Sequence, residues 1–237
     1  MIDLFQLQSI NRSSWACNSE RKFKRFWDLL AVSFTLPLIV PLMSIIAFLI
    51  KQDSTGPVLF LQERVGLREK PFKVYKFRTM VKGAEEQGTS VTAEKDPRIT
   101  AFGHILRQTK LDELPQLFNV LRGDMSLVGP RPDVTEIVEN YTPEMRRVFQ
   151  IRPGITSLAT LHLRDEATIL AGVRDPDTFY EEVLVPLKVG LAMEHVDRNS
   201  FAFDFKILCQ TIWMLTLGRW WPIQEHSAIS ELKQKIK

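Results

Sequence analysis

The sequence predicts an α+β protein, mainly helical, in which one N-terminal element lies in a membrane and the rest folds as one domain. Three observations lead to this fold class. The only long apolar run covers residues 26–50, short alternating segments bounded by turn residues indicate strands, and longer segments have the apolar spacing of helices. A chain of 237 residues, 45% of them hydrophobic, can enclose one sizeable core.

Composition argues against several classes of protein. The net charge of +3 is only mildly basic, and no zinc-finger spacing, RNP-like aromatic motif or long Lys/Arg tract is present, so we expect no nucleic-acid partner. Cys17 and Cys209 lie far apart in the sequence and form no C-x-x-C motif, which makes a reducing cytosolic setting the default. The four histidines form no H-E-x-x-H motif, so zinc catalysis is not expected.

The apolar run at residues 26–50 admits two membrane geometries. As a helix it would be about 37 Å long against a bilayer core of about 30 Å, which suits a single span. However, positive charges flank it on both sides and favour the cytoplasm for both ends. Pro37 and Pro41 near its middle each remove a helix hydrogen bond and favour a bend, so a helix–break–helix that enters one leaflet and returns is the other geometry. The residues alone leave both open, whereas a cleaved signal peptide is disfavoured because the run starts late.

The order of elements follows from this run and from the turn signals after it. We expect a polar extension at residues 1–20, a membrane element at 21–51 and a cytosolic domain at 52–237. Within the membrane element, Asp28 is expected near the headgroups, within a helical turn of Lys24 or Arg25. The domain is expected to contain strands at 57–62 and 72–79 with a turn around Gly66, and a polar loop at 82–95. Helices are expected at 99–108, 112–123, 134–150 with an internal restart at Thr142-Pro143-Glu144, 177–198 and 201–217, and an extended segment at 155–163.

The last of these helices is strongly apolar and aromatic. Trp213, Trp220 and Trp221 would suit a membrane interface, where indole rings lie at headgroup level. The same composition also fits a helix that is simply part of the core, and both interpretations stay open.

Residues 111–132 concentrate the residue types that handle phosphate through a divalent metal. Carboxylates hold hard cations such as Mg²⁺, and arginine forks match phosphate oxygens. Asp112 and Glu113 stand just ahead of Pro115, and proline is tolerated in the first helical turn. The acids are therefore expected at a helix N-terminus, where free N–H groups can meet phosphate oxygens. Acidic residues before a proline also begin many ordinary helices, so the pair taken alone is explained by capping.

The ordered motifs along the chain together resemble the bacterial sugar transferase family, the small monotopic phosphoglycosyl transferases. The resemblance runs from about residue 24 to about residue 216. The motifs that carry it are Lys24-Arg-Phe-Trp-Asp28, a proline in the middle of the membrane segment, Gln62-Glu-Arg-Val-Gly66, Tyr75-Lys-Phe-Arg-Thr-Met80, Asp96-Pro-Arg-Ile-Thr100 with Gly103, Asp112-Glu113, Gly129-Pro-Arg-Pro132 and Arg152-Pro-Gly-Ile-Thr156.

The resemblance implies a reaction and a location. The family transfers a phospho-sugar from a UDP-sugar to polyprenyl (undecaprenyl) phosphate at the cytoplasmic face of the bacterial inner membrane, releasing UMP and starting polysaccharide or glycoconjugate assembly. Its fold is monotopic, with a re-entrant helix broken at a Ser-Pro or similar pair and a compact cytosolic domain with short strands and amphipathic interface helices. Here the break corresponds to Pro41, which follows Val40 instead of serine, and Pro37 is an additional proline.

The resemblance also implies roles for site residues. Asp112 would be the nucleophile and a ligand of Mg²⁺, Asp124 a second candidate ligand, and Glu113 an aid in proton handling or metal placement. The expected phosphate-binding residues are Arg107, Arg131, Arg152, Lys76 and Arg78. For each of these cations an ordinary ion pair or solvated surface is the alternative.

Two other classes of function are compatible with parts of the sequence. A membrane-anchored scaffold would keep the fold but would have no need of the Asp112–Glu113 pair with its arginines. A soluble nucleotide-sugar glycosyltransferase would not explain the apolar run, and the chain has no G-x-G-x-x-G segment. The residues leave open the sugar, whose pocket is expected within 161–180, and whether the chain forms a homo-oligomer.

Overall fold

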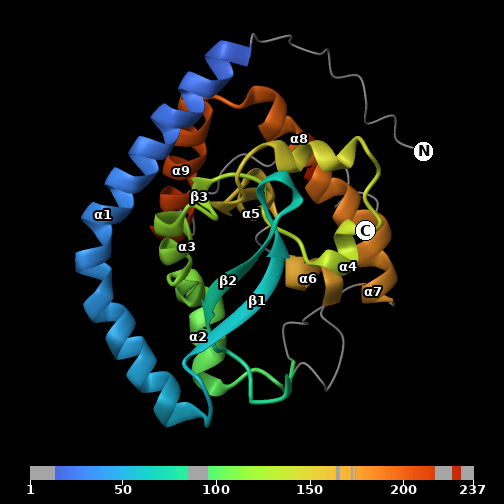
Figure 1. Ribbon diagram of the computed structural model, residues 1–237. Helices are drawn as coiled ribbons and strands as arrows, with labels where there is room; N and C mark the ends of the chain where they lie inside the picture. Colours follow the sequence, from blue (N-terminus) through green and yellow to red (C-terminus); the bar gives the residue numbers. More distant parts are fainter. Residues whose placement is uncertain are drawn as a thin grey trace.

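The chain folds into a mainly helical domain with small sheets, along one side of which a long N-terminal helix runs (Figure 1). The computed structural model describes residues 14–84, 96–163, 166–171, 173, 175–216 and 226–230. Trp220 and Trp221 and most of the loop expected at 82–95 lie outside these residues.

Helix α1 spans Ser14–Asp53 and begins within the stretch expected as a polar extension. It is helical without interruption across Pro37 and Pro41, and in Figure 1 it bends near its middle so that both ends approach the domain. Within the described part of the chain, Arg21–Asp53 is the one helical stretch long and apolar enough to cross a membrane. Only 17% of the residues in its most apolar window are buried, so α1 is not a core helix of an ordinary soluble protein.

Two antiparallel strands form a hairpin, β1 (Leu59–Val65) and β2 (Pro71–Phe77). A short 3₁₀ turn, Leu67–Glu69, joins them directly after Gly66, where the sequence predicted the turn. The hairpin is attached to the following helices by the buried Asn119, whose side chain accepts from the Tyr75 amide at 3.0 Å and donates to the Lys73 carbonyl at 2.7 Å. The two predicted strands are therefore confirmed, with β1 shifted toward the turn.

The helix predicted before the acidic pair is confirmed, whereas the helix predicted to start near Asp112 begins only at Gln116, so the two acids precede it instead of forming its first turn. Helix α2 covers Ala101–Thr109, and Thr100 caps it by accepting from the Gly103 amide. A 3₁₀ turn at Leu111–Glu113 leads into α3 (Gln116–Arg122). Gly123 ends α3 in the left-handed conformation, with φ at 95°, which glycine adopts without steric cost.

A second, smaller sheet pairs β3 (Ser126–Val128) with β4 (Gly154–Thr156) in parallel. A Cβ atom on Gly154 would lie 2.0 Å from the Gly129 nitrogen, so the two backbones can meet only because residue 154 has no side chain. The expectation of an extended segment over 155–163 is right only for its beginning. Ser157 accepts from the Thr160 amide and thereby starts α5 (Leu158–His162), because a hydroxyl at this position satisfies a free helical N–H group.

The expected helix at 134–150 is divided in the structure near Pro143, where the sequence predicted a restart. It consists of α4 (Thr135–Val138) and a 3₁₀ segment at Met145–Gln150, separated by the turn that contains Pro143. Further along, α6 spans Glu166–Ala171, α7 Pro176–Phe179, a π-helical turn Tyr180–Leu184, α8 Val185–Arg198 and α9 Phe201–Thr216. The predicted helices at 177–198 and 201–217 thus correspond to the α7–α8 stretch and to α9.

Buried apolar clusters hold these elements together in two regions. One joins α5, α8 and α9 through residues such as Leu158, Leu191 and Ile207. Another joins α1 to the hairpin and α3 through Val32, Val74 and Val120. The domain therefore packs against the inner side of α1, and Leu127 of β3 packs against both clusters.

Candidate active site around Asp112 and Glu113

The acidic pair lies at a tight turn between two helices. Lys110 ends α2 in the left-handed conformation, with φ at 58°, and its amide donates to the Arg107 carbonyl at 3.3 Å. This reversal leads directly into the 3₁₀ turn that carries Asp112 and Glu113. A non-glycine residue in this conformation costs roughly 1–2 kcal/mol, which the surrounding packing must offset.

Glu113 binds two cations that come from other parts of the chain. Lys76 of β2 donates to Oε1 at 3.0 Å, and Arg131, from the loop after β3, donates to the same oxygen at 2.8 Å. Burial works to raise the pKa of Glu113, but the charges and hydrogen bonds of Arg131 and Lys76 outweigh it and hold the pKa well below its usual value. Glu113 is therefore ionised, and it in turn raises the pKa of Arg131.

Asp112, the residue next to Glu113, has a pKa that is shifted in the opposite direction. It is 9% exposed, and its Oδ1 atom is buried without a hydrogen-bond partner among the described residues. Burial raises its pKa, and the negative charge of Glu113 raises it further, whereas Lys76 and Lys110 act against this shift. A pair of carboxylates whose pKa values are shifted in opposite directions is typical of sites where two acids have different chemical roles.

Arg107 completes the set of cations near Asp112. Its Nε atom donates to the Thr79 hydroxyl at 2.9 Å, and its charge contributes to lowering the pKa of Asp112 toward the ordinary range. Burial lowers the pKa of Arg107 itself, but the guanidinium stays charged. Three of the five predicted phosphate-binding cations, Lys76, Arg107 and Arg131, are thus brought to the acidic pair.

The other two predicted phosphate-binding cations lie elsewhere. Arg152 donates from Nε to the Gly123 carbonyl at 2.9 Å, at the end of α3. The Arg78 guanidinium is directed to the end of α1, where it donates to the Ser54 carbonyl at 2.7 Å and to the Pro57 carbonyl. The structure therefore gives Arg78 a contact to backbone carbonyls and does not bring it to Glu113.

Asp124, the second predicted metal ligand, also belongs to a different set of charges. Its carboxylate lies 3.6 Å from Nε of Arg122, and the side chain is 31% exposed. No group of three or more His, Cys, Asp or Glu side chains with metal-binding geometry is present among the described residues. A magnesium ion at the acidic pair would have the free Oδ1 of Asp112 as its protein ligand, and Mg²⁺ commonly completes its coordination with water and substrate phosphate.

The start of α1 is bonded directly to the segment that carries Arg131. Lys24 donates to the Val128 carbonyl at 2.7 Å, and Asp28 accepts from the Ser126 hydroxyl at 2.7 Å. Asp28 is only 6% exposed and its carboxylate contacts β3, a partner that the sequence did not reveal. This strand presents a hydroxyl and a free amide to the carboxylate.

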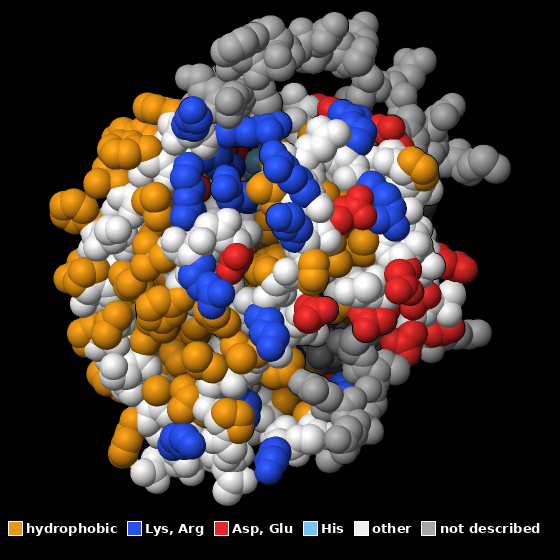
Figure 2. Space-filling model, in the orientation of Figure 1, with side chains coloured by type: hydrophobic (Ala, Val, Ile, Leu, Met, Phe, Trp, Pro, Cys, Tyr) orange, Lys and Arg blue, Asp and Glu red, His pale blue; other side chains and the backbone are white. Residues whose placement is uncertain are grey.

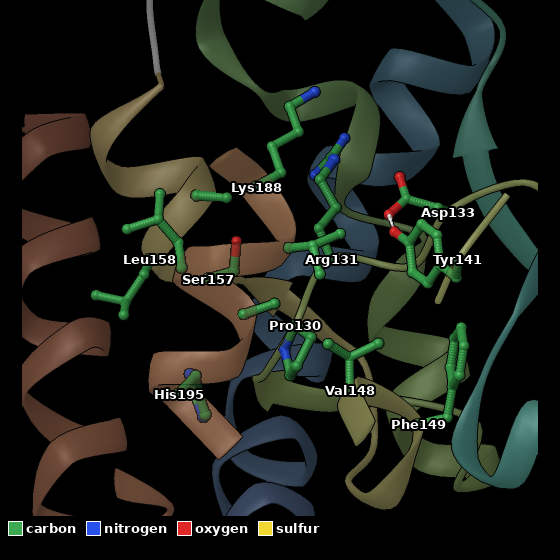
Figure 3. Close-up of a pocket in the computed structure, with 14 residues that line it drawn as sticks. Pro130, Arg131, Asp133, Tyr141, Val148, Phe149, Ser157, Leu158, Lys188 and His195 are labelled. Atoms are coloured by element: carbon green, nitrogen blue, oxygen red, sulfur yellow. Dashed lines mark hydrogen bonds between the residues drawn. The ribbon is translucent and has the colours of Figure 1, made fainter. Parts of the chain in front are cut away.

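A narrow, mostly apolar cavity lies behind Arg131 (Figure 3). The apolar wall includes Val148, Phe149 and Leu158, and the polar groups include Arg131 and Lys188. Figure 3 shows the charged ends of both cations directed to the same side of the cavity. The cavity is therefore lined both by Arg131, which binds Glu113, and by Lys188 of α8, a helix to which the sequence assigned no role in the site.

Some buried residues that belong to none of the motifs were missed by the sequence analysis. Asp204 of α9 lies 2.5 Å from the Lys24 ammonium and 2.9 Å from the His195 ring, and all three are largely buried. Lys188 was missed as well. The sequence did contain a signal, because these charged residues stand alone on otherwise apolar faces of helices. A charged side chain in such a place needs either a partner or contact with solvent.

An exposed apolar surface covers the outer side of α1 and continues onto α9. Figure 2 shows hydrophobic side chains gathered on the side of the molecule along which α1 runs. Phe34 and Leu38 of α1 are 76% and 80% exposed, and Phe205 and Ile212 of α9 are also exposed. Aromatic contacts join the two helices, since the Phe23 and Phe201 rings lie 5.0 Å apart. A patch of this kind marks membrane association.

Residues 19–218 match the bacterial sugar transferase family, and the chain therefore belongs to this family of transferases. The resemblance drawn from the sequence motifs is thereby confirmed. Among its relatives, the UDP-glucose:undecaprenyl-phosphate glucose-1-phosphate transferase of Caulobacter vibrioides is 39% identical over 194 residues, which are 80% of this chain and 68% of that protein.

Two further relatives are longer proteins. The UDP-N-acetylgalactosamine-undecaprenyl-phosphate N-acetylgalactosaminephosphotransferase of Aeromonas hydrophila is 45% identical over 139 residues, 57% of this chain and 33% of that protein. The UDP-glucose:undecaprenyl-phosphate glucose-1-phosphate transferase of Escherichia coli (strain K12) is 36% identical over 195 residues, 81% and 40% of the two chains. The aligned part thus spans about a third and two fifths of these relatives.

Proposed function

We propose that this protein transfers a phospho-sugar from a UDP-sugar to polyprenyl phosphate through a covalent intermediate on Asp112. The observation that carries the proposal is the buried carboxylate of Asp112, whose Oδ1 atom has no hydrogen-bond partner among the described residues. It lies next to an ionised Glu113 that is held by two cations. The relatives named above act on UDP-sugars or undecaprenyl phosphate, which supports this choice of substrates.

In the first step, an oxygen of Asp112 attacks the β-phosphorus of the donor. A bond forms between the carboxylate and phosphorus, and the bond from this phosphorus to the bridging oxygen breaks, so that UMP leaves with the electron pair. The raised pKa of Asp112 makes its ionised form a stronger nucleophile than an ordinary aspartate. Arg107 and Arg131 offset the negative charge that the diphosphate brings to the acids.

In the second step, an oxygen of polyprenyl phosphate attacks the same phosphorus. The bond to Asp112 breaks, the carboxylate is restored and polyprenyl diphosphate sugar is released. Glu113 remains ionised throughout because Lys76 and Arg131 bind it, so its role is to fix these cations where the phosphates arrive. A carboxylate nucleophile divides one difficult transfer into two easier ones.

Magnesium fits the chemistry of this site. The Oδ1 atom of Asp112 has no hydrogen-bond partner among the described residues, and Mg²⁺ held by this carboxylate would supply charge neutralisation on the diphosphate as UMP departs. Asp124 remains a predicted ligand, although its carboxylate lies beside Arg122.

The membrane element places the acids beside their lipid substrate. We propose that α1 enters one leaflet and returns, that residues 21–51 form this element and that residues 52–237 form the catalytic domain on the cytoplasmic side of the inner membrane. The bend of α1 in Figure 1, the contacts of Lys24 and of the Ile50 carbonyl with the domain, and the exposed apolar outer side of the helix support this geometry. A polyprenyl acceptor cannot leave the bilayer, so the acids must lie close to headgroup height.

Replacing Asp112 with asparagine tests the nucleophile. The variant should release no UMP above background with Mg²⁺, polyprenyl phosphate and a UDP-sugar panel, and no phospho-sugar adduct should be trapped on the protein. The variant should stay folded and melt a few degrees higher, because a carboxyl group whose folded pKa is raised loses stability as the pH rises through that pKa. Full turnover by Asp112→Asn would refute the covalent route.

A further inference from the structure

Glu113 and Arg131 carry opposite charges, and two further residues of alternating charge, Glu166 and Lys188, extend this series. The carboxylate of Glu113, and more weakly that of Glu166, raises the pKa of Arg131, so Glu166 lies within electrostatic reach of this guanidinium. On its other side Glu166 accepts from the Lys188 ammonium at 2.7 Å. Glu166 belongs to α6 and Lys188 to α8, two elements that carry none of the recognisable motifs.

Tyr180 completes this group. Its hydroxyl lies 3.2 Å from the Lys188 ammonium, and the same ammonium lies 4.4 Å from the centre of the Tyr180 ring. The Lys188 side chain is 13% exposed and Glu166 28%, so both are sheltered but open on one side. Lys188 and Arg131 line the same cavity, which places the group next to the cation that holds Glu113 (Figure 3).

These three side chains offer the interactions that a sugar ring requires. A carboxylate accepts hydrogen bonds from hydroxyl groups, an ammonium donates to hydroxyl or carbonyl oxygens, and an aromatic ring packs against the apolar face of a pyranose. Glu166 and Lys188 are partly exposed, so a sugar would approach them from their open side, beside the small cavity of about 30 Å³ that Arg131 and Lys188 line. The phosphate of the donor would meanwhile contact Arg131.

Resting on the function proposed above, we propose that Glu166, Tyr180 and Lys188 form the subsite that selects the sugar of the UDP-sugar donor. The Glu166–Lys188 ion pair holds both groups in position before the donor binds. When the sugar enters, its hydroxyl groups exchange hydrogen bonds with the pair. A sugar whose hydroxyl points away from these groups leaves them partly unsatisfied and is therefore used more slowly.

The test is the relative use of four donors, UDP-glucose, UDP-galactose, UDP-N-acetylglucosamine and UDP-N-acetylgalactosamine, by full-length protein in vesicles. The variants are Glu166→Gln, Lys188→Met and the mild Tyr180→Phe, which retains the ring. We expect the ratio of kcat/KM between the best and second-best donor to change about tenfold, the effect of one hydrogen bond to a charged group. Inhibition by UMP, which has no sugar, should change less than about twofold.

Matched controls separate this role from a structural one. Glu182→Gln and Lys73→Met remove exposed charges of the same kind and should leave the ratios unchanged. The charge exchange Glu166→Lys with Lys188→Glu restores an ion pair but inverts the groups offered to the sugar, so the altered selectivity should persist.

Two results would overturn the subsite. One is an equal slowing of all four donors in each variant, and the other is recovery of the original selectivity by the charge exchange. Wild-type protein that releases UMP from none of the four donors would instead refute the proposed function, and the subsite with it.

Discussion

Asp112 and Glu113 are adjacent carboxylates whose pKa values are displaced in opposite directions by their surroundings. Burial and the neighbouring charge raise the pKa of Asp112, while Arg131 and Lys76 outweigh burial and lower that of Glu113. The difference does not come from the residues themselves but from the partners that β2 and the loop after β3 bring to only one of them. Two carboxyl groups with opposite pKa shifts thereby coexist within one turn.

The pH dependence of the reaction should report this coupling. Asp112 must be ionised to attack phosphorus, so kcat/KM should rise with pH through the pKa of Asp112. After burial, the charge of Glu113 is the second cause of the raised pKa of Asp112, and Glu113→Gln removes it. The acid limb of the profile should therefore move to lower pH, although the variant is slower. The measurement is the pH profile of UMP release for both proteins, and an acid limb that moves to higher pH would contradict the assignment.

Arg78 provides a second test at the scale of single residues. Its guanidinium donates to carbonyl groups at the end of α1 and is 7% exposed, so Arg78→Met would leave buried carbonyls without donors. We expect a loss of about 2–4 kcal/mol in stability, measured by thermal unfolding in detergent, with a KM for the UDP-sugar close to that of the wild type. A large rise in KM without loss of stability would restore the predicted phosphate-binding role.

At the scale of secondary-structure elements, α1 combines features that rarely occur in one helix. It contains two prolines and remains helical across both, and it bends with its apolar side outward. Its first turns are bonded to β3 and α3, because Arg25 donates to the Val120 carbonyl at 2.6 Å and Lys24 to the Val128 carbonyl. The other end is held by Arg78, so the domain fixes both ends of the bend.

Removing the prolines should change the path of α1. In the double variant Pro37→Ala/Pro41→Ala, both missing hydrogen bonds can form and a straight span is favoured. With Cys209, which is exposed, replaced by serine, Cys17 can be labelled by a membrane-impermeant maleimide in spheroplasts. A re-entrant α1 keeps Cys17 on the cytoplasmic side, so Cys17 should be protected from the reagent in the parent protein. In the double proline variant Cys17 should lie on the other side of the membrane and be labelled. Labelling of the parent protein would show that α1 spans the bilayer.

At the scale of the whole molecule, the apolar sides of α1 and α9 form one surface, joined by the aromatic rings of Phe23, Trp27 and Phe201. The sequence left open whether the aromatic helix at 201–217 belongs to the core or to an interface. The structure gives it both roles, because Ile207 is buried while Phe205 and Ile212 are exposed. The catalytic domain therefore has its own apolar contact beside the membrane helix.

This surface should affect the lipid substrate more than the soluble one. Phe205→Asp with Ile212→Asp places two charges on the exposed side of α9 and should separate the domain from the headgroups while α1 remains inserted. We expect the KM for polyprenyl phosphate in vesicles to rise about tenfold and the KM for the UDP-sugar to stay within about twofold. Lys206→Gln on the same helix is the control, and an equal rise in both constants would argue against the membrane contact.

Sequence patterns were sufficient to predict the family, the hairpin, the helix before the acidic pair, the glycine end of the helix after it and the apolar segment. These follow from local patterns, such as proline before α3, glycine after it and alternation in the strands. The prediction was poor where a local pattern was ambiguous. Residues 155–163 were expected to be extended, but Ser157 caps a helix that begins at Leu158.

Which charged residues meet became clear from the folded structure alone. Lys76, Arg107 and Arg131 converge on the acids, whereas Arg78 and Asp28, equally prominent in the sequence, contact backbone and β3. Lys188 and Glu166 approach each other across 22 positions of the chain. The physical reason is that charge pairing in a buried site depends on distances between elements, and residue type and spacing along the chain specify only the elements themselves.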